Sequence, residues 1–202
     1  MDMGIDLGQV NLACCVLDRA TGRIARWAVL DLTEGQGAKK MTIEQLVERA
    51  VGLFEPGGEL LADVGRVFIE AQPCGRGSLN IKTKVLSHAL QALFLSQGLA
   101  TSFVNPKAKQ PKGLSYAQRK RSAVNSCAAL LEGAAQDEVH RDYFRGLKKK
   151  DDAADSFLVA WIGQGRALPA QEVAEKKPRQ PKQPKQQKEP TKQEQDEEQP
   201  SV

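Results

Sequence analysis

The chain has 202 residues, of which 41% are hydrophobic, and a formal net charge of +4. This length suffices for one domain of ordinary size with a tail, and no apolar run is long enough to span a membrane. The segment Met1–Gly4 carries an acid and no basic region, unlike a secretory signal, and the four cysteines form neither a disulfide framework nor a zinc motif. We therefore expect a reduced, intracellular protein that is not secreted.

The composition changes near residue 170. The segment Gln171–Val202 holds seven Lys or Arg, seven Asp or Glu, five prolines and no aromatic residue. Such a segment buries too little apolar surface to fold, and its prolines favour extended conformations. We therefore assign residues 1–168 to one folded domain and residues 169–202 to a disordered tail rich in Pro, Gln, Lys and Glu. A proline-motif ligand or a basic import signal in this tail stays an alternative to a plain solvated segment.

Apolar runs separated by turn residues predict the strands. The runs at 3–9, 12–18 and 24–32 predict three antiparallel strands, and 64–71 and 100–104 predict two more. Helical spacing predicts helices over 40–54, 78–98, 115–132 and 151–162, with Val85, Ala89, Ala92, Leu93 and Leu95 facing inward in the second. We expect an α/β fold, a mixed sheet with helices on both faces.

Four acids stand where a carboxylate needs a partner. Asp6 and Glu70 lie in apolar strands, where burial of a charge is costly unless it is compensated. Asp152 and Asp155 are three residues apart, so a helix stacks them on one face, and a multivalent cation relieves their repulsion. The four acids suit a hard cation with oxygen ligands, and two Mg²⁺ ions there would support phosphodiester hydrolysis.

Each acid also has a separate structural explanation. Asp6 is then a turn cap, Glu70 is a charge on an edge strand, and Asp152 and Asp155 are first-turn acids that favour the helix dipole. A shared site is favoured because two apolar strands each carry an acid with no local explanation.

Basic residues gather in the middle of the chain. Between Glu70 and Glu132 there is no acid. The nine basic residues of this stretch are Arg76, Lys82, Lys84, Lys107, Lys109, Lys112, Arg119, Lys120 and Arg121. This polarised charge suits the phosphates of nucleic acid, although an ordinary solvated face that lacks acids is the alternative.

Several motifs carry a family resemblance. Gly4–Gly8 (GIDLG) followed by Asn11–Ala13, then Ile69–Pro73 (IEAQP), then Asp151–Phe157 (DDAADSF) resemble the Holliday junction resolvases of poxviruses and other large DNA viruses. These are RuvC-like enzymes of the RNase H-like superfamily, and fungal mitochondrial resolvases are similar. The stretches 103–107 and 115–122 resemble the viral group too, so the likeness covers about residues 3–163. The first motif is widespread in the superfamily, whereas the second and third in this order are specific.

The resemblance implies an RNase H-like fold and a set of site residues. Asp6, Glu70, Asp152 and Asp155 match the four catalytic, metal-binding acids of the family, which hold Mg²⁺ or Mn²⁺, two ions per site. Asp151 is an unassigned fifth acid, and Asp2 adds another acid ahead of the first motif. Viral relatives carry basic residues before the last motif, so Lys148 and Lys149 join the expected DNA-binding set. One lysine of the Lys148–Lys150 run is expected to stabilise phosphate charge, without a sign of which.

The activity implied is Mg²⁺-dependent cleavage of Holliday junctions and other branched DNA by paired symmetric nicks, in recombination and repair. The alternatives are an RNase H-like nuclease acting on flaps or RNA–DNA hybrids, and a catalytically silent nucleic-acid-binding module. We expect the site of action to be the viral replication site of the host cell, in the cytoplasm or nucleus.

The implied partners are branched DNA and a second copy of the chain. A four-way junction has two strands to cut, and a two-fold dimer presents two related active sites to them. The stripe formed by Leu86, Leu90 and Phe94 is a candidate for the dimer interface, with the protein core as its alternative. No membrane partner is expected.

Overall fold

The computed structural model describes residues 1–72, 81–109, 113–133 and 136–169, and the predicted tail lies outside them apart from its first residue. The strands are β1 (Asp2–Leu7), β2 (Asn11–Leu17), β3 (Ile24–Asp31), β4 (Arg66–Glu70) and β5 (Ala100–Val104). They form one sheet in the order β3-β2-β1-β4-β5. β1 to β3 are antiparallel neighbours, whereas β4 is parallel to β1 and β5 is parallel to β4. The predicted mixed sheet is confirmed.

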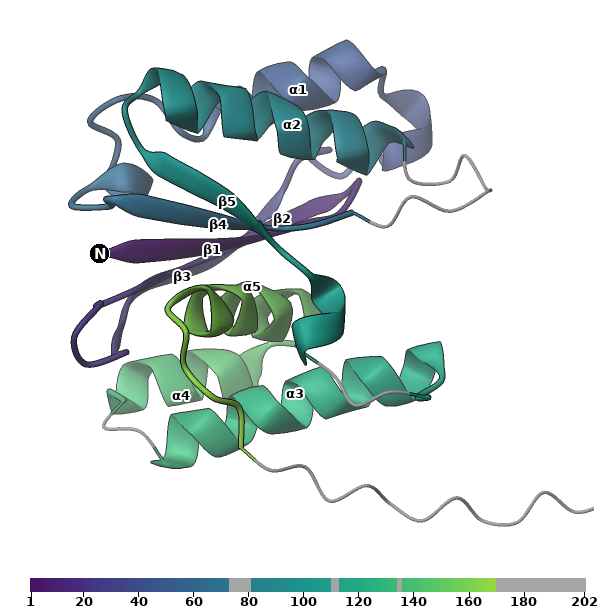
Figure 1. Cartoon of the computed structure of the whole chain (residues 1–202). Coiled ribbons are helices and arrows are strands. Elements are labelled where there is room, and N and C mark those ends of the chain that lie inside the picture. The colour runs from purple at the N-terminus through teal and green to yellow at the C-terminus, as the bar shows by residue number, and fades with distance from the viewer. Residues whose placement is uncertain (73–80, 110–112, 134–135, 170–202) are drawn as a thin grey trace, which may run out of the picture. The chain divides into compact units, whose positions relative to one another are not determined.

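Helices cover both faces of this sheet. They are α1 (Ile43–Gly52), α2 (Ile81–Ser96), α3 (Tyr116–Gly133), α4 (Glu138–Gly146) and α5 (Asp151–Gly163). Figure 1 shows α1 and α2 on one face and α3, α4 and α5 on the other. The sequence predictions missed α4, a short helix that buries only Phe144, which stacks on Trp27 with ring centroids 5.4 Å apart. No helix of the described residues is long and apolar enough to cross a membrane.

The strand β1 contributes to both layers of the core. Successive side chains of a strand point to opposite faces. Met3 and Ile5 therefore pack with the side chains of α1 and α2, while Gly4 faces α5. Asp2 and Asp6 lie on the same face of β1 as Gly4, so β1 carries a carboxylate at each end of the face that α5 covers.

The helix α5 lies against β1 at very short range because Gly4 has no side chain. A Cβ atom placed at Gly4 would lie 2.3 Å from the backbone nitrogen of Ala160 and 2.4 Å from the carbonyl oxygen of Ser156. No side chain fits in this space. The contact brings the first turns of α5 to the end of β1 where Asp6 lies.

The helix α2 buries a different face from the one predicted. Leu86, Leu90 and Phe94 are fully buried, and the ring of Phe94 packs edge-on against Phe54 with centroids 5.1 Å apart. The predicted inward face is wrong: Val85, Ala92 and Leu95 are exposed, and Ala89 and Leu93 are only half-buried. The helix is apolar on two sides, so spacing alone did not identify the side that packs on α1 and the sheet. The Leu86, Leu90 and Phe94 stripe belongs to the core and is not available as an interface.

Candidate active site

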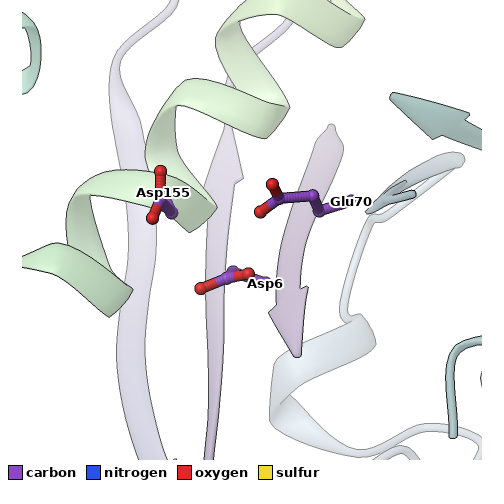
Figure 2. Close-up of side chains that lie close together, drawn as sticks. All are labelled: Asp6, Glu70 and Asp155. Atoms are coloured by element: carbon purple, nitrogen blue, oxygen red, sulfur yellow. The ribbon is translucent and has the colours of Figure 1, made fainter. Parts of the chain in front are cut away.

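Three of the predicted acids meet at one edge of the sheet. The side chains of Asp6, Glu70 and Asp155 place carboxylate oxygens within 4.8 Å of one another. Figure 2 shows the three side chains lying close together. Asp6 and Glu70 stand at the ends of the parallel neighbours β1 and β4, and parallel strands end at the same edge of a sheet. Asp155 comes from the second turn of α5, which the Gly4 contact brings close. We refer to these three residues as the acid cluster.

The acid cluster concentrates carboxylates in a partly buried place. Burial raises the pKa of Asp6 well above its ordinary value, and the neighbouring carboxylates of Glu70 and Asp155 raise it further. Burial also raises the pKa of Asp155, and Glu70 adds to this, while the nearby Lys109 acts in the opposite direction. Closely spaced carboxylates destabilise their own charged forms, and a divalent cation compensates for this. The donor set, oxygen only, is the set that hard cations such as Mg²⁺ prefer.

A buried lysine balances part of this charge. The Nζ of Lys109 lies 2.9 Å from Oε2 of Glu70 and 2.6 Å from Oδ1 of Asp155, and its side chain is 1% exposed. Although burial lowers it, the surrounding carboxylates raise the pKa of Lys109 above its ordinary value. The sequence analysis placed Lys109 among the surface residues that contact DNA; the structure places it inside the acid cluster.

The fourth predicted acid, Asp152, lies beside the cluster and is held by two donors. Its Oδ2 accepts a hydrogen bond from the Nδ2 of Asn11 at 2.7 Å. The Nζ of Lys149 donates to both carboxylate oxygens, at 2.8 Å to Oδ1 and 2.7 Å to Oδ2. The structure therefore brings together Asp6, Glu70 and Asp155 and ties Asp152 to other partners.

The fifth acid, Asp151, is paired with lysines. Its carboxylate accepts a hydrogen bond from Lys120 and lies 3.8 Å from the Nζ of Lys149. Although burial acts in the opposite direction, these two lysines lower the pKa of Asp151. Asp151 thus binds lysines next to the acid cluster and does not join it.

The family model described as "Poxvirus A22 protein" matches residues 3–162. The chain belongs to the poxvirus A22 protein family. A sequence search among curated proteins finds no match.

Solved structures share the fold of this A22 family member. The fowlpox virus resolvase, solved in complex with its substrate Holliday junction DNA, has 20% identity and a TM-score of 0.56 over 81% of this chain and 96% of the resolvase. The Thermus thermophilus RuvC structure in complex with a Holliday junction substrate has 18% identity and a TM-score of 0.52, over 84% and 98% of the two chains. At these identities the likeness shows a RuvC and resolvase fold.

The predicted DNA-contacting residues occupy several environments in the A22 family member. The exposed ones are Lys84, Lys107, Arg119, Arg121, Lys148 and Lys149. Lys82 is half-buried and donates to the carbonyl oxygens of Ala38 and Met41, so it ties α2 to the segment before α1. Arg76 and Lys112 lie outside the described residues. The six exposed residues present their charged groups to solvent.

The sequence analysis missed the roles of Lys109 and Asn11. Lys109 ends a short 3-10 helix, Pro106–Lys109, directly after β5, the strand next to β4. The sequence signal is limited to the position of Lys109 soon after a predicted strand, and the structure adds that this strand lies beside the one that ends in Glu70. Asn11 opens β2 beside the end of β1, and its presence in the first motif was noted without a role.

Proposed function

We propose that this chain is a divalent-metal-dependent endodeoxyribonuclease that resolves Holliday junctions and other branched DNA by paired symmetric nicks. The observation that carries the proposal is the meeting of Asp6, Glu70 and Asp155 at the end of the sheet, in a RuvC and resolvase fold. Three converging carboxylates on such a fold suit phosphodiester hydrolysis better than they suit a passive binding module.

The residues of the site fit Mg²⁺, with Mn²⁺ as a substitute. Asp6, Glu70 and Asp155 offer oxygen ligands at short mutual distance, and Asp152 stands one helical turn before Asp155 to extend the set. Two such ions, when bound, supply an activated water and neutralise charge on the leaving oxygen. The ammonium of Lys109 lies next to the ligand oxygens, so we assign it the stabilisation of negative charge on the phosphate.

The exposed lysines and arginines support binding of duplex arms. Phosphate contacts from such residues position the nucleic acid and read no sequence. Lys107 follows β5 near the acid cluster, and Arg119 and Arg121 lie on α3. We propose that they orient the arms of a junction so that the branch point meets the acid cluster.

We further propose that the nuclease acts as a homodimer through α2. Ile81 and Leu95 are 55% and 54% exposed, and Val85 is 39% exposed, so the outer side of this helix is an apolar surface that no described residue covers. A hollow on it is lined by Ile81, Lys84, Val85, His88 and Ala89. A second copy that buries this surface would provide the paired active sites that two symmetric nicks require. Sedimentation analysis should give a dimer for the wild type and a monomer for Val85→Asp; a monomeric wild type at micromolar concentration would contradict the dimer.

The decisive experiment compares a synthetic four-way junction with a linear duplex of matched sequence. Wild type with Mg²⁺ should produce paired nicks only in the junction, with none in EDTA. Asp155→Asn should be inactive, and Asp151→Asn, one turn away and outside the acid cluster, serves as the matched control. Binding of the junction without cleavage would favour a catalytically silent binding module. Equal cleavage of flaps or RNA–DNA hybrids would show that the nuclease is not specific for the junction.

The biological setting that follows is the processing of branched recombination, repair and replication intermediates. Residues 1–168 would form the nuclease domain. We propose the viral replication site of the host cell as its place of action, because branched viral DNA arises there.

A further inference from the structure

The lysine run before α5 contains one residue with a specific partner. Lys149 donates to both oxygens of Asp152 and lies 3.8 Å from Asp151. Lys150 instead lies over the ring of Phe144, with its Nζ 5.9 Å from the centroid. Lys148 is exposed and makes no ion pair with any residue that the structure describes. The geometry therefore distinguishes Lys149 from its two neighbours.

Asp152 is held at two points that differ in how readily they are released. The Asn11 amide belongs to the start of β2 and binds Oδ2 alone. Lys149 binds Oδ1 and Oδ2, and its side chain is 56% exposed, whereas that of Asp152 is 18% exposed. The amide is fixed by the sheet, while the ammonium is on a flexible side chain in contact with solvent.

We infer that Lys149 is a positioning residue that couples DNA binding to completion of the metal site. Its ammonium holds Asp152 until a DNA phosphate draws that ammonium away, and Asp152 then offers Oδ1 to a metal ion beside the acid cluster. The inference rests on the proposed function and adds to it a residue that links DNA binding to metal binding.

Competition for the ammonium follows from elementary charge chemistry. A carboxylate oxygen that accepts a short bond from an ammonium has less electron density for a cation, and the positive charge of Lys149 repels that cation. Duplex DNA presents one phosphate charge per roughly 1.7 Å of its axis, so an exposed lysine beside it meets a dense alternative partner. Throughout the exchange the Asn11 amide keeps Oδ2, so the carboxylate stays aligned.

The inference predicts that substitutions of two adjacent lysines have different effects on Mn²⁺ affinity. Calorimetric titration of the full chain with Mn²⁺, without DNA, should give on the order of fivefold tighter binding for Lys149→Met than for wild type, the effect of removing one partly exposed ion pair. Lys148→Met removes the same charge one residue away and should leave the Mn²⁺ affinity unchanged. Lys149→Arg, which restores a cation, should return it to the wild-type value.

A second measurement is made on the four-way junction. The Mg²⁺ concentration for half-maximal single-turnover cleavage should be nearly equal for wild type and Lys149→Met, because bound DNA has already removed Lys149 from Asp152 in the wild type. Junction affinity should fall for both lysine variants, with a shallower salt dependence. Thermal unfolding confirms that each variant is folded.

Two results would overturn the inference. In one, Lys149→Met binds Mn²⁺ no more tightly than wild type. In the other, Lys149→Met and Lys148→Met tighten Mn²⁺ binding equally. That result would indicate that the loss of either positive charge strengthens cation binding without a specific contact to Asp152. If wild type fails to cleave any junction, the proposed function fails, while the Mn²⁺ titrations still decide whether Lys149 restrains Asp152.

Discussion

The two ends of β1 carry the same residue type in opposite environments. Asp2 and Asp6 lie on one face of the strand, four residues apart, and both face α5. Asp2 accepts hydrogen bonds from Arg66 at 2.6 and 2.9 Å and from Arg19 at 3.0 Å. Although burial acts in the opposite direction, these guanidinium groups lower the pKa of Asp2 to about 2. At the other end, burial and neighbouring carboxylates raise the pKa of Asp6.

The comparison teaches that burial of an acid does not by itself indicate a functional site. Asp2 also accepts a hydrogen bond from Gln164 just after α5, so it connects β1, β4, the β2–β3 turn and the end of α5. Among the residues that the structure describes, Asp6 has no comparable set of donors and instead meets other acids. One carboxylate is satisfied by donors of the fold, and the other lies in the acid cluster that we propose binds a divalent cation.

The largest expected effect is on cleavage, at the Asp6 end. Asp6→Asn should reduce junction cleavage by on the order of 10²–10³-fold or more, since it removes a charged group at the reacting centre. The same change relieves carboxylate repulsion, so the free energy of unfolding in EDTA should stay equal or rise. Single-turnover cleavage and chemical denaturation measure the two effects. If Asp6→Asn were less stable than wild type in EDTA, Asp6 would stabilise the fold as Asp2 does, and the proposed difference between the two acids would be wrong.

At the Asp2 end the effect should fall on stability. Asp2→Asn leaves two guanidinium groups without their shared carboxylate. It should lower the free energy of unfolding by about 2–3 kcal/mol, less than for most fully buried pairs, because both arginines reach solvent. Cleavage per folded molecule should match wild type. Urea denaturation gives the first value; a loss of cleavage without a loss of stability would show that Asp2 acts on the site.

The stability gained on metal binding should also differ between variants at the two ends of β1. Wild type and Asp2→Asn should both gain up to about 2.7 kcal/mol of stability at a Mn²⁺ concentration 100 times the dissociation constant, and Asp6→Asn should gain much less. Lys109→Met should be less stable than wild type in EDTA, because the acid cluster loses its internal cation, and should gain more from Mn²⁺. Thermal unfolding with and without the ion tests this; equal gains in all four proteins would contradict a metal site at the acid cluster.

The smallest effect is a difference in pH dependence. The pKa of Asp2 is lower in the folded protein than its ordinary value of 3.8, so its stabilising effect is complete above about pH 4 and is lost as the pH falls toward 2. The pKa of Asp6 is raised, so Asp6 destabilises the fold progressively as the pH rises above about 4. In EDTA, the stability advantage of Asp6→Asn over wild type should therefore grow with pH, and the deficit of Asp2→Asn should shrink in acid. If the stabilities of Asp2→Asn and Asp6→Asn changed with pH in parallel, the opposite pKa shifts of Asp2 and Asp6 would be contradicted.

Much of the fold and part of the site could be predicted from the sequence. The strands that end near Asp6 and Glu70 followed from apolar runs, and the Asp152–Asp155 spacing followed from helix geometry. The packed face of α2 could not be chosen, because both of its sides are apolar. The place of Lys109 depends on β5 lying beside β4, a pairing between distant segments that local patterns do not contain. The same holds for Asn11, whose partner Asp152 is 141 residues away in the chain.

The close contact at Gly4 imposes a geometric requirement on the active site that the presence of the acidic residues alone does not reveal. The separation of Asp6 and Asp155 is fixed by main-chain atoms of β1 and α5 meeting where a side chain is missing. One added methyl group at position 4 would move the helix from the strand and widen the arrangement of ligands, although every ligand would still be present. A relative that retains all four acids but carries a larger residue at this position is therefore expected to be folded, acidic at the same edge and unable to assemble a metal site.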